Sequence, residues 1–199
     1  MQKRWRLNKY RVKKILEHYT IERYYTIFRE HILEYQHKTL MGFDGEIELD
    51  ESYFGARRVR GKRGRGAAGK TPVFGILKRG GRVFLTVVKA CSKKELMPII
   101  TGQILETSTV YTDGWKAYDG LIVNGYDHYR VFHDKNEFAR GKSHINGIES
   151  FWSYAKRRMA KFNGIASHRF VLYLKESEFR FNNPTGDLFG ILCKQVLFI

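Results

Sequence analysis

Four acidic side chains lie within positions 46–51, a density that an ordinary strand does not carry. Apolar and polar residues alternate through positions 46–54, which predicts a β-strand with Ile47, Leu49 and Tyr53 on one face. Acidic residues are poor strand formers, and clustered carboxylates repel one another unless a cation lies among them. Because hard divalent ions such as Mg²⁺ prefer oxygen ligands, this strand is a candidate side of a metal site. The alternative interpretation is a solvent-exposed strand edge.

Two further acids are placed where other predicted elements would carry them to this strand. Asp113 follows a short β-branched strand at 108–112, and Glu149 lies on a long helix at 145–162. We therefore predict that Asp50, Asp113 and Glu149 are the catalytic residues and the metal ligands, holding two Mg²⁺ or Mn²⁺ ions about 4 Å apart. Taken singly, the Asp113-Gly114 pair is also a common turn, and Glu149 is compatible with an ordinary helix surface.

The long helix has distinct faces that would position its acid. Its packing stripe consists of Ile145, Ile148, Trp152, Ala155 and Met159. A neighbouring face carries Glu149, Ser153 and Lys156 at helical spacing, so the acid would stand beside the buried stripe and the lysine two turns further along.

The order of the predicted elements indicates how the acids would meet. Strands are predicted at 46–54, 71–78, 82–89, 108–112 and 126–132, and helices at 92–105, 115–121, 145–162 and 167–181, with a short amphipathic tail at 187–199. Ser92 with Glu95 predicts a capping box, and Ser167 predicts a second helix cap. The order β-β-β-α-β-α-β-α-α is that of an α/β ribonuclease-H-like core with a mixed sheet, in which the first and fourth strands lie side by side and parallel.

Composition narrows the partners and the compartment. The chain has 199 residues, 43% of them hydrophobic, and a net charge of +16, which favours a polyanionic partner, above all nucleic acid. Its two cysteines, Cys91 and Cys193, form no CxxC pair, which excludes a disulfide scaffold and fits a reducing compartment. No apolar run is long enough to span a bilayer. We expect a cytoplasmic protein, associated with the nucleoid when bound to DNA, and no membrane partner.

Two basic segments flank the acidic strand. The glycine-rich stretch 55–70 carries seven cations and no anion, which predicts a loop that contacts DNA phosphates through Arg57, Arg58, Arg60, Lys62, Arg63 and Arg65. Residues 1–41 form a basic region with helical spacing at 12–19 and again at 21–35, which predicts two helices that either touch DNA or pack on the domain at 42–199. Forty residues leave little room for a complete helix-turn-helix.

Four sequence motifs resemble those of the small bacterial insertion-sequence transposases of the DDE class. They are LDESYFG at 49–55, YTDGW at 111–115, HINGIESFW at 144–152 and LYLKESEFRFNN at 172–183. The resemblance implies a ribonuclease-H-like catalytic domain, dependence on divalent metal, and cutting and joining of DNA at element ends. Because two ends must be joined together, we expect a homodimer or a larger assembly. It places Asp50, Asp113 and Glu149 at the three acids of the pattern. Relatives of this kind generally carry a longer DNA-recognition region at the amino terminus.

Other residues allow two interpretations each. Asn146 is a rival to Glu149 as third ligand, and it is grouped with Lys142, His144 and Lys156 as predicted DNA contacts. His133 and His144 either contact a scissile phosphate or lie on the surface. Trp115 and Trp152 either stack on a flipped base or pack in the core, and core packing is the commoner case. Glu176 and Glu178 are predicted not to face inward together, and to pair with nearby Arg and Lys.

Two other functions remain open beside the transposase. A catalytically silent DNA-binding remnant would bind DNA in a salt-sensitive way without cleaving it, and the short amino-terminal region favours it. A structure-selective nuclease on the same core would release nicks without joined strands. The full set of acids argues against the remnant, because phosphate binding alone needs no carboxylates.

Overall fold

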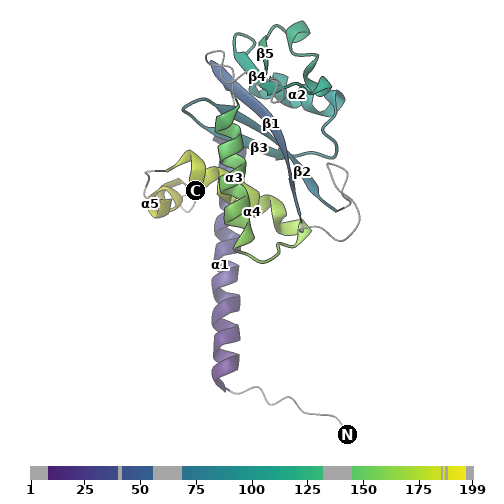
Figure 1. Ribbon diagram of the computed structural model, residues 1–199. Helices are drawn as coiled ribbons and strands as arrows, with labels where there is room; N and C mark the ends of the chain where they lie inside the picture. The colour runs from purple at the N-terminus through teal and green to yellow at the C-terminus, as the bar shows by residue number, and fades with distance from the viewer. Residues whose placement is uncertain are drawn as a thin grey trace.

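The computed structural model describes residues 9–39, 42–55, 69–131, 145–184, 186 and 188–195. Its elements are arranged around one sheet (Figure 1). In chain order they are α1 (Lys9–Thr39), β1 (Glu46–Phe54), β2 (Thr71–Lys78), β3 (Val83–Val87), α2 (Lys93–Gln103), β4 (Thr109–Asp113), the 3₁₀ turns η1 (Lys116–Tyr118) and η2 (Ile122–Asn124), β5 (Asp127–Val131), α3 (Asn146–Ala160), η3 (Ser167–Arg169), α4 (Phe170–Asn182) and α5 (Leu188–Gln195).

The five strands form a mixed sheet in the order β3-β2-β1-β4-β5. β2 runs antiparallel to both β1 and β3, whereas β4 runs parallel to β1 and to β5. The hairpin between β2 and β3 and the parallel pairing of the first and fourth strands are confirmed. This arrangement is the ribonuclease-H-like fold that the element order predicted. The helix predicted at 115–121 is wrong, because the chain forms two 3₁₀ turns between β4 and β5 instead.

Helices cover both faces of the sheet. On one face α2 and the 3₁₀ turns pack over Ile47, Leu49 and the inward side chains of the neighbouring strands. On the other face α3 and α4 pack over Val73 and Leu85. Burial of each large apolar side chain in these two layers stabilises the folded chain by about 1.5–3 kcal/mol. β1 is therefore a central strand with neighbours on both sides, and the alternative of a solvent-exposed edge is wrong.

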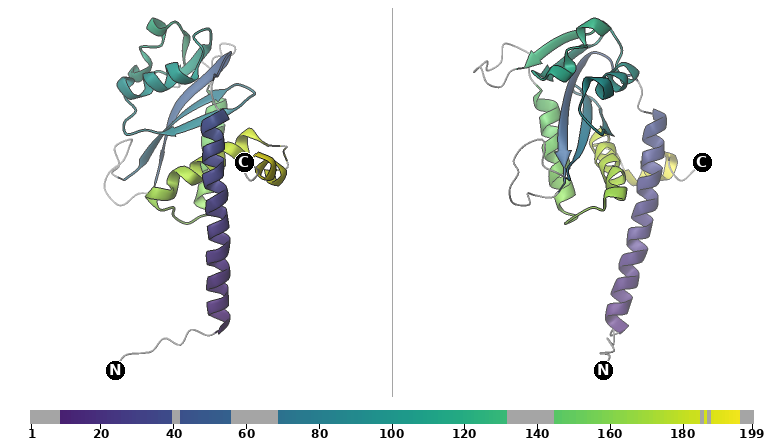
Figure 2. Two further views of the ribbon diagram at one scale, coloured as in Figure 1. Left: turned by 180° about the vertical axis from the view of Figure 1, so that it is seen from behind. Right: turned by 90° about the vertical axis from the view of Figure 1, so that its right-hand side faces the viewer.

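The amino-terminal region contains one helix where two were predicted. α1 runs without a break through 31 residues, because positions 9–39 contain no glycine or proline to interrupt it. Its carboxyl-terminal half packs on α4, while its amino-terminal half extends away from the rest of the chain (Figure 2). The division at residue 20 that the spacing suggested is therefore wrong.

The prediction for Glu176 and Glu178 is also wrong in part. Both side chains are buried, because α4 is enclosed by α1, α3 and β3 rather than exposed along one side. Glu176 accepts hydrogen bonds from Arg29 of α1 at 2.8 Å, from Arg158 of α3, and from Arg180 at 2.9 Å. The predicted pairing with basic side chains is confirmed for both acids.

Glu178 lies on the same helix as Glu176, and its side chain faces β3 and α1. It accepts hydrogen bonds from Lys175 at 2.8 Å, from the backbone N–H of Leu85 at 2.8 Å and from Gln36 at 2.9 Å. α4 therefore joins the amino-terminal helix to the sheet through buried charged groups.

Neither predicted helix cap forms through its side chain. Ser92 precedes α2 without a side-chain cap bond, and Glu95 accepts hydrogen bonds from the backbone N–H groups of Lys89 and Ala90 instead of that of Ser92. Ser167 begins a 3₁₀ turn, and α4 starts only at Phe170. No helix in the described ranges combines the length and the apolar character that crossing a membrane requires.

Candidate active site

Asp50 and Asp113 occupy equivalent places on the two central parallel strands. The ladder between β1 and β4 pairs Glu46 with Thr109 and Glu48 with Tyr111, and Asp50 and Asp113 each lie two residues beyond this last pair on their own strands. Neighbouring strands lie about 4.8 Å apart, and residues at equivalent positions face the same side. Asp113 is the last residue of β4, at the carboxyl end where ligands of open α/β sheets gather.

The carboxylate of Asp50 lies under α3 and is oriented by that helix. Its Oδ2 accepts a hydrogen bond from the indole Nε1 of Trp152 at 3.1 Å. The indole fits there because Gly75, which pairs with Asp50 across β1 and β2, has no side chain: a Cβ at this position would lie 2.7 Å from the Trp152 ring. Trp152 is buried and packs against Phe54 and Phe151, so it is a core residue rather than a base-stacking one.

Charge and burial act together on Asp50. Burial, together with the smaller effects of the negative charges of Asp113 and Glu149, raises the pKa of Asp50 to about 6, against hydrogen bonds from the Glu51 backbone and Trp152 that lower it. The charges of the other two acids therefore reach Asp50, which places all three in one electrostatic neighbourhood.

Asp113 and Glu149 are held by different local structures. The Oδ1 of Asp113 accepts the backbone N–H of Trp115 at 3.0 Å, so this carboxylate closes the turn that follows β4. Glu149 lies in the first turn of α3, with its side chain exposed. Asn146, the rival third ligand, is the first residue of the same helix and is also exposed.

The donor set suits a hard divalent ion, although the described side chains are not gathered around one point. No three His, Cys, Asp or Glu side chains in the described part of the chain converge closely enough to hold a metal ion. Two of the three acids instead use one oxygen in a local hydrogen bond, to Trp152 and to the Trp115 backbone. An all-carboxylate set in which the charges of Asp113 and Glu149 raise the pKa of Asp50 is the environment that a divalent cation relieves.

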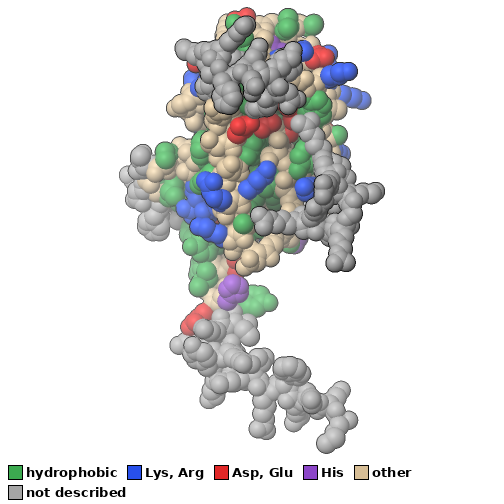
Figure 3. Space-filling view, viewed as in Figure 1, with side chains coloured by type: hydrophobic (Ala, Val, Ile, Leu, Met, Phe, Trp, Pro, Cys, Tyr) green, Lys and Arg blue, Asp and Glu red, His purple; other side chains and the backbone are tan. Residues whose placement is uncertain are grey.

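Lysine and arginine side chains lie on the same face of the molecule as a group of acidic side chains. Asp and Glu side chains gather near the upper part of α3, and Lys and Arg side chains lie below them (Figure 3). Lys156 lies close enough for the charge of Asp50 to raise its pKa, although desolvation by neighbouring atoms has the larger effect and lowers it. Of the other predicted DNA contacts, Arg57, Arg58, Arg60, Lys62, Arg63, Arg65, Lys142 and His144 lie outside the described residues, as does His133.

Sequence reasoning missed two residues beside the site. Glu48 is only 1% exposed, and its carboxylate bonds to Arg79 and to the backbone of α3 rather than facing a metal site. Arg79 lies in the turn between β2 and β3, where the sequence indicated only a hairpin. The excess of acids on β1 was the available signal for such a pair, because a buried carboxylate needs a cationic partner. The sequence did not identify Arg79 as that partner.

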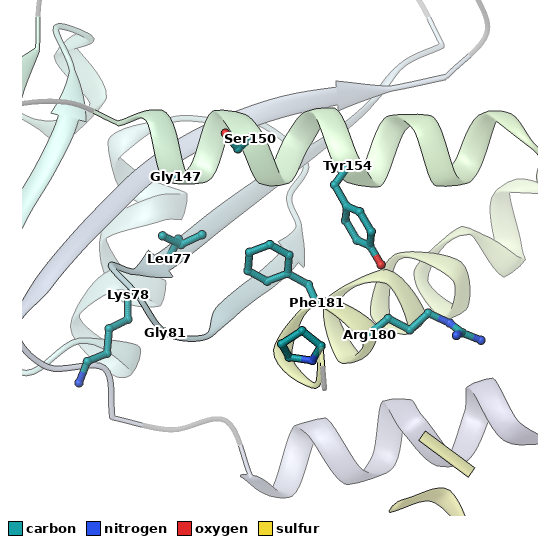
Figure 4. Close-up of a pocket in the computed structure, with 10 residues that line it drawn as sticks. Leu77, Lys78, Gly81, Gly147, Ser150, Tyr154, Arg180 and Phe181 are labelled. Carbon is teal, nitrogen blue, oxygen red and sulfur yellow. The ribbon is translucent and has the colours of Figure 1, made fainter. Parts of the chain in front are cut away.

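A groove of about 650 Å³ lies on another side of α3. Gly147, Ser150 and Tyr154 of α3 face it across Leu77 and Phe181 (Figure 4). None of the three candidate acids lines it, and its two basic side chains are engaged, Lys78 with Asp44 and Arg180 with Glu176. The groove and the acids are therefore separate features.

Comparison with known proteins assigns a family to this chain. Residues 42–182 match the ISXO2-like transposase domain. A transposase-like protein of Haemophilus influenzae is 45% identical over 102 residues, which cover 51% of this chain and 82% of that protein. A protein in the transposable element ISH50 of Halobacterium salinarum is 33% identical over 153 residues, which cover 69% of this chain and 52% of that protein.

Among solved structures, the catalytic core domain of BIV integrase superposes with a TM-score of 0.47 at 12% identity, over 73% of this chain and 88% of that chain. The sequence matches, and not this superposition, assign the family.

Proposed function

The chain belongs to the family of ISXO2-like transposase domains, and from this premise we propose that it cuts DNA at the ends of an insertion element and joins those ends to target DNA. The observation that carries the proposal is the position of Asp50 and Asp113 at equivalent places on β1 and β4, with Glu149 on the helix that packs over them. Phosphate binding alone gives no reason to hold carboxylates together.

We propose that Asp50, Asp113 and Glu149 hold Mg²⁺ or Mn²⁺, in keeping with a donor set made only of carboxylates. When bound, such ions lower the pKa of an attacking water or 3′-hydroxyl and stabilise the leaving 3′-oxygen. The role of the chain is to orient its carboxylates. The Trp152 N–H orients that of Asp50 and also opposes the rise of its pKa, and the Trp115 backbone N–H orients that of Asp113.

The basic surface would hold the DNA in place. Lys156 lies near Asp50 on the exposed face of α3, so it can contact a phosphate beside the bond that is cut. We assign the same role to the basic segments 55–70 and 1–41, which fits the net charge of +16. Because two element ends must be joined, we propose that the active species is a homodimer or a larger assembly.

The test is strand transfer of a labelled element end with Mn²⁺, comparing the wild-type chain with Asp50→Asn. We expect joined products from the wild type and a loss of at least about a thousandfold in the variant, because one ligand of the site is gone. Asp127→Asn is the matched control: it removes the same charge from an exposed residue at the amino-terminal end of β5.

Each product pattern separates the candidate functions. Nicked DNA without joined strands would identify a structure-selective nuclease on the same core. Salt-sensitive DNA binding without any cleavage would identify a silent remnant. Joined strands that persist in the Asp50→Asn variant would refute the proposed site.

A further inference from the structure

The carboxylate of Glu48 bridges two partners in the core. Its Oε2 accepts the backbone N–H of Ile148, in the first turn of α3, at 2.8 Å. Its Oε1 accepts the Nε of Arg79 at 2.9 Å. The first amides of a helix have no partner within the helix, and the N-cap residue Ile145 supplies none from its side chain. A carboxylate from β1 therefore caps α3, where it also meets the positive end of the helix dipole.

Arg79 extends the same contact to β4. Its guanidinium carbon lies 3.7 Å from the centroid of the Tyr111 ring, and its Nη1 lies 3.5 Å from Oε1 of Glu46. The hydroxyl of Tyr111 donates to that same Glu46 oxygen at 3.0 Å. The Arg79 backbone N–H donates to the Glu46 carbonyl at 2.9 Å, which fixes the turn against β1.

All three elements that carry the candidate acids meet in this cluster. Glu48 precedes Asp50 by two residues on β1, Tyr111 precedes Asp113 by two residues on β4, and Ile148 directly precedes Glu149 on α3. Glu48 and Tyr111 are also partners in the parallel ladder. A displacement at the contact between Glu48 and Ile148 would therefore move Glu149, the next residue of α3.

Gly147 also shows how closely the first turn of α3 approaches the Glu48 carboxylate. A Cβ at this position would lie 2.8 Å from Oε2 of Glu48 and 3.1 Å from Cδ2 of Leu77. Glycine is a poor helix former, and here it lets the first turn of α3 approach the carboxylate.

We propose that Glu48 is a positioning residue, held by Arg79, that docks the first turn of α3 so that Glu149 stands over Asp50 and Asp113. This inference rests on the proposed function for its catalytic meaning, but the docking itself can be measured without any reaction. It also means that Glu48, although acidic and next to the site, is not a metal ligand.

The experiment compares Glu48→Gln with Glu46→Gln in the full chain. Both variants remove one negative charge from β1 near Arg79, but of these two side chains only that of Glu48 hydrogen-bonds to α3 within the described part of the chain. We expect the amides of Ile148 and Glu149 to exchange with deuterium about tenfold faster in Glu48→Gln, without the same change in β2. The Mn²⁺ concentration for half-saturation, measured by calorimetry without DNA, should rise about tenfold. In Glu46→Gln, the exchange rates of these amides and the Mn²⁺ concentration for half-saturation should stay within about twofold of wild type.

Gly147→Ala is the second variant. Alanine is the better helix former, so a role limited to helix propensity predicts slower exchange at the start of α3. Contact with Glu48 predicts faster exchange and weaker Mn²⁺ binding, as in Glu48→Gln.

Three results would overturn the proposal: exchange in Glu48→Gln equal to that in Glu46→Gln, slower exchange in Gly147→Ala, or loss of Mn²⁺ binding in Glu48→Gln with unchanged exchange, which would make Glu48 a ligand. A wild-type chain that joins no DNA would refute the proposed function. Faster exchange in Glu48→Gln would support the docking in that case too.

Discussion

The indole N–H of Trp152 donates to Oδ2 of Asp50 across 3.1 Å, so one contact joins the packing of α3 to the orientation of a candidate ligand. The indole is buried, and the carboxylate beneath it has a pKa raised to about 6 chiefly by burial. A helix that moved away from β1 would take with it both Glu149 and the hydrogen bond to Asp50. Packing and chemistry are thus coupled at this point of the fold.

Trp152→Phe tests that coupling. Phenylalanine retains most of the buried apolar surface but removes the N–H. We therefore expect the rate of strand transfer to fall about tenfold and the free energy of unfolding to fall proportionately less. The matched control is Trp115→Phe, because Trp115 bonds to Asp113 through its backbone N–H, which the substitution keeps. Equal losses in both variants would mean that the indole N–H has no special role.

Gly75→Ala tests the space that the indole needs. The added Cβ would lie 2.7 Å from Trp152 and 3.0 Å from Ile148, so α3 must shift. We expect the free energy of unfolding in urea to fall by about 1–3 kcal/mol. Gly102→Ala is the control, since nothing lies within 4 Å of its Cβ, and alanine favours a helix there. A neutral Gly75→Ala would show that α3 packs less closely than described.

Arg29→Met tests the attachment of α1. Arg29 is buried, and its Nε donates to Glu176 at 2.8 Å, so the variant leaves a buried carboxylate with only Arg158 and Arg180. We expect a loss of about 2–4 kcal/mol in the free energy of unfolding. Arg23→Met, at an exposed position of the same helix, should change it by less than about 0.5 kcal/mol. Similar values for the two variants would contradict a structural role for the buried contact.

Glu178 predicts a pH dependence of stability. Burial raises its pKa from 4.5 to about 7, against the opposing effects of Lys175 and the Leu85 N–H. Between these pH values the folded chain retains a proton that the unfolded chain has lost, so the contribution of Glu178 to stability decreases as pH rises through this window. Replacing the pair, Glu178→Gln with Lys175→Met, should flatten this part of the curve in urea titrations at several pH values. A curve parallel to that of the wild type would contradict the raised pKa.

Lys156→Gln tests the position of the DNA. If Lys156 contacts one phosphate, the variant should weaken binding to all sequences similarly and reduce the slope of log affinity against log salt by about one. The control is Lys94→Gln. Lys94 lies on α2, which covers the opposite face of the sheet, so this variant should leave the slope unchanged. The same reduction in both variants would indicate binding by net charge rather than by this face.

The sequence predicted the parts of the fold that depend on local pattern. Alternation through positions 46–54 placed Ile47 and Leu49 in one core layer, and the order of the elements placed the first and fourth strands side by side. That order also predicted the neighbourhood of Asp50 and Asp113, because parallel strands end at the same edge of a sheet. The exposed face of α3 followed from its helical spacing.

What the sequence did not predict depends on contacts between distant residues. Glu48 and Arg79 are 31 positions apart, and nothing local marks them as partners. Glu176 and Glu178 are both buried because α1 covers α4, and α1 was expected as two helices. The absence of glycine and proline in positions 9–39 was the overlooked signal for one helix.

A crystal of the chain soaked in Mn²⁺ shows by anomalous scattering whether Asp50, Asp113 and Glu149 gather divalent cations. We expect manganese bound between the carboxylates of Asp50 and Asp113, with the Glu149 side chain turned towards it. Manganese bound only elsewhere, or none at these carboxylates when the soak saturates other sites, would refute this metal site.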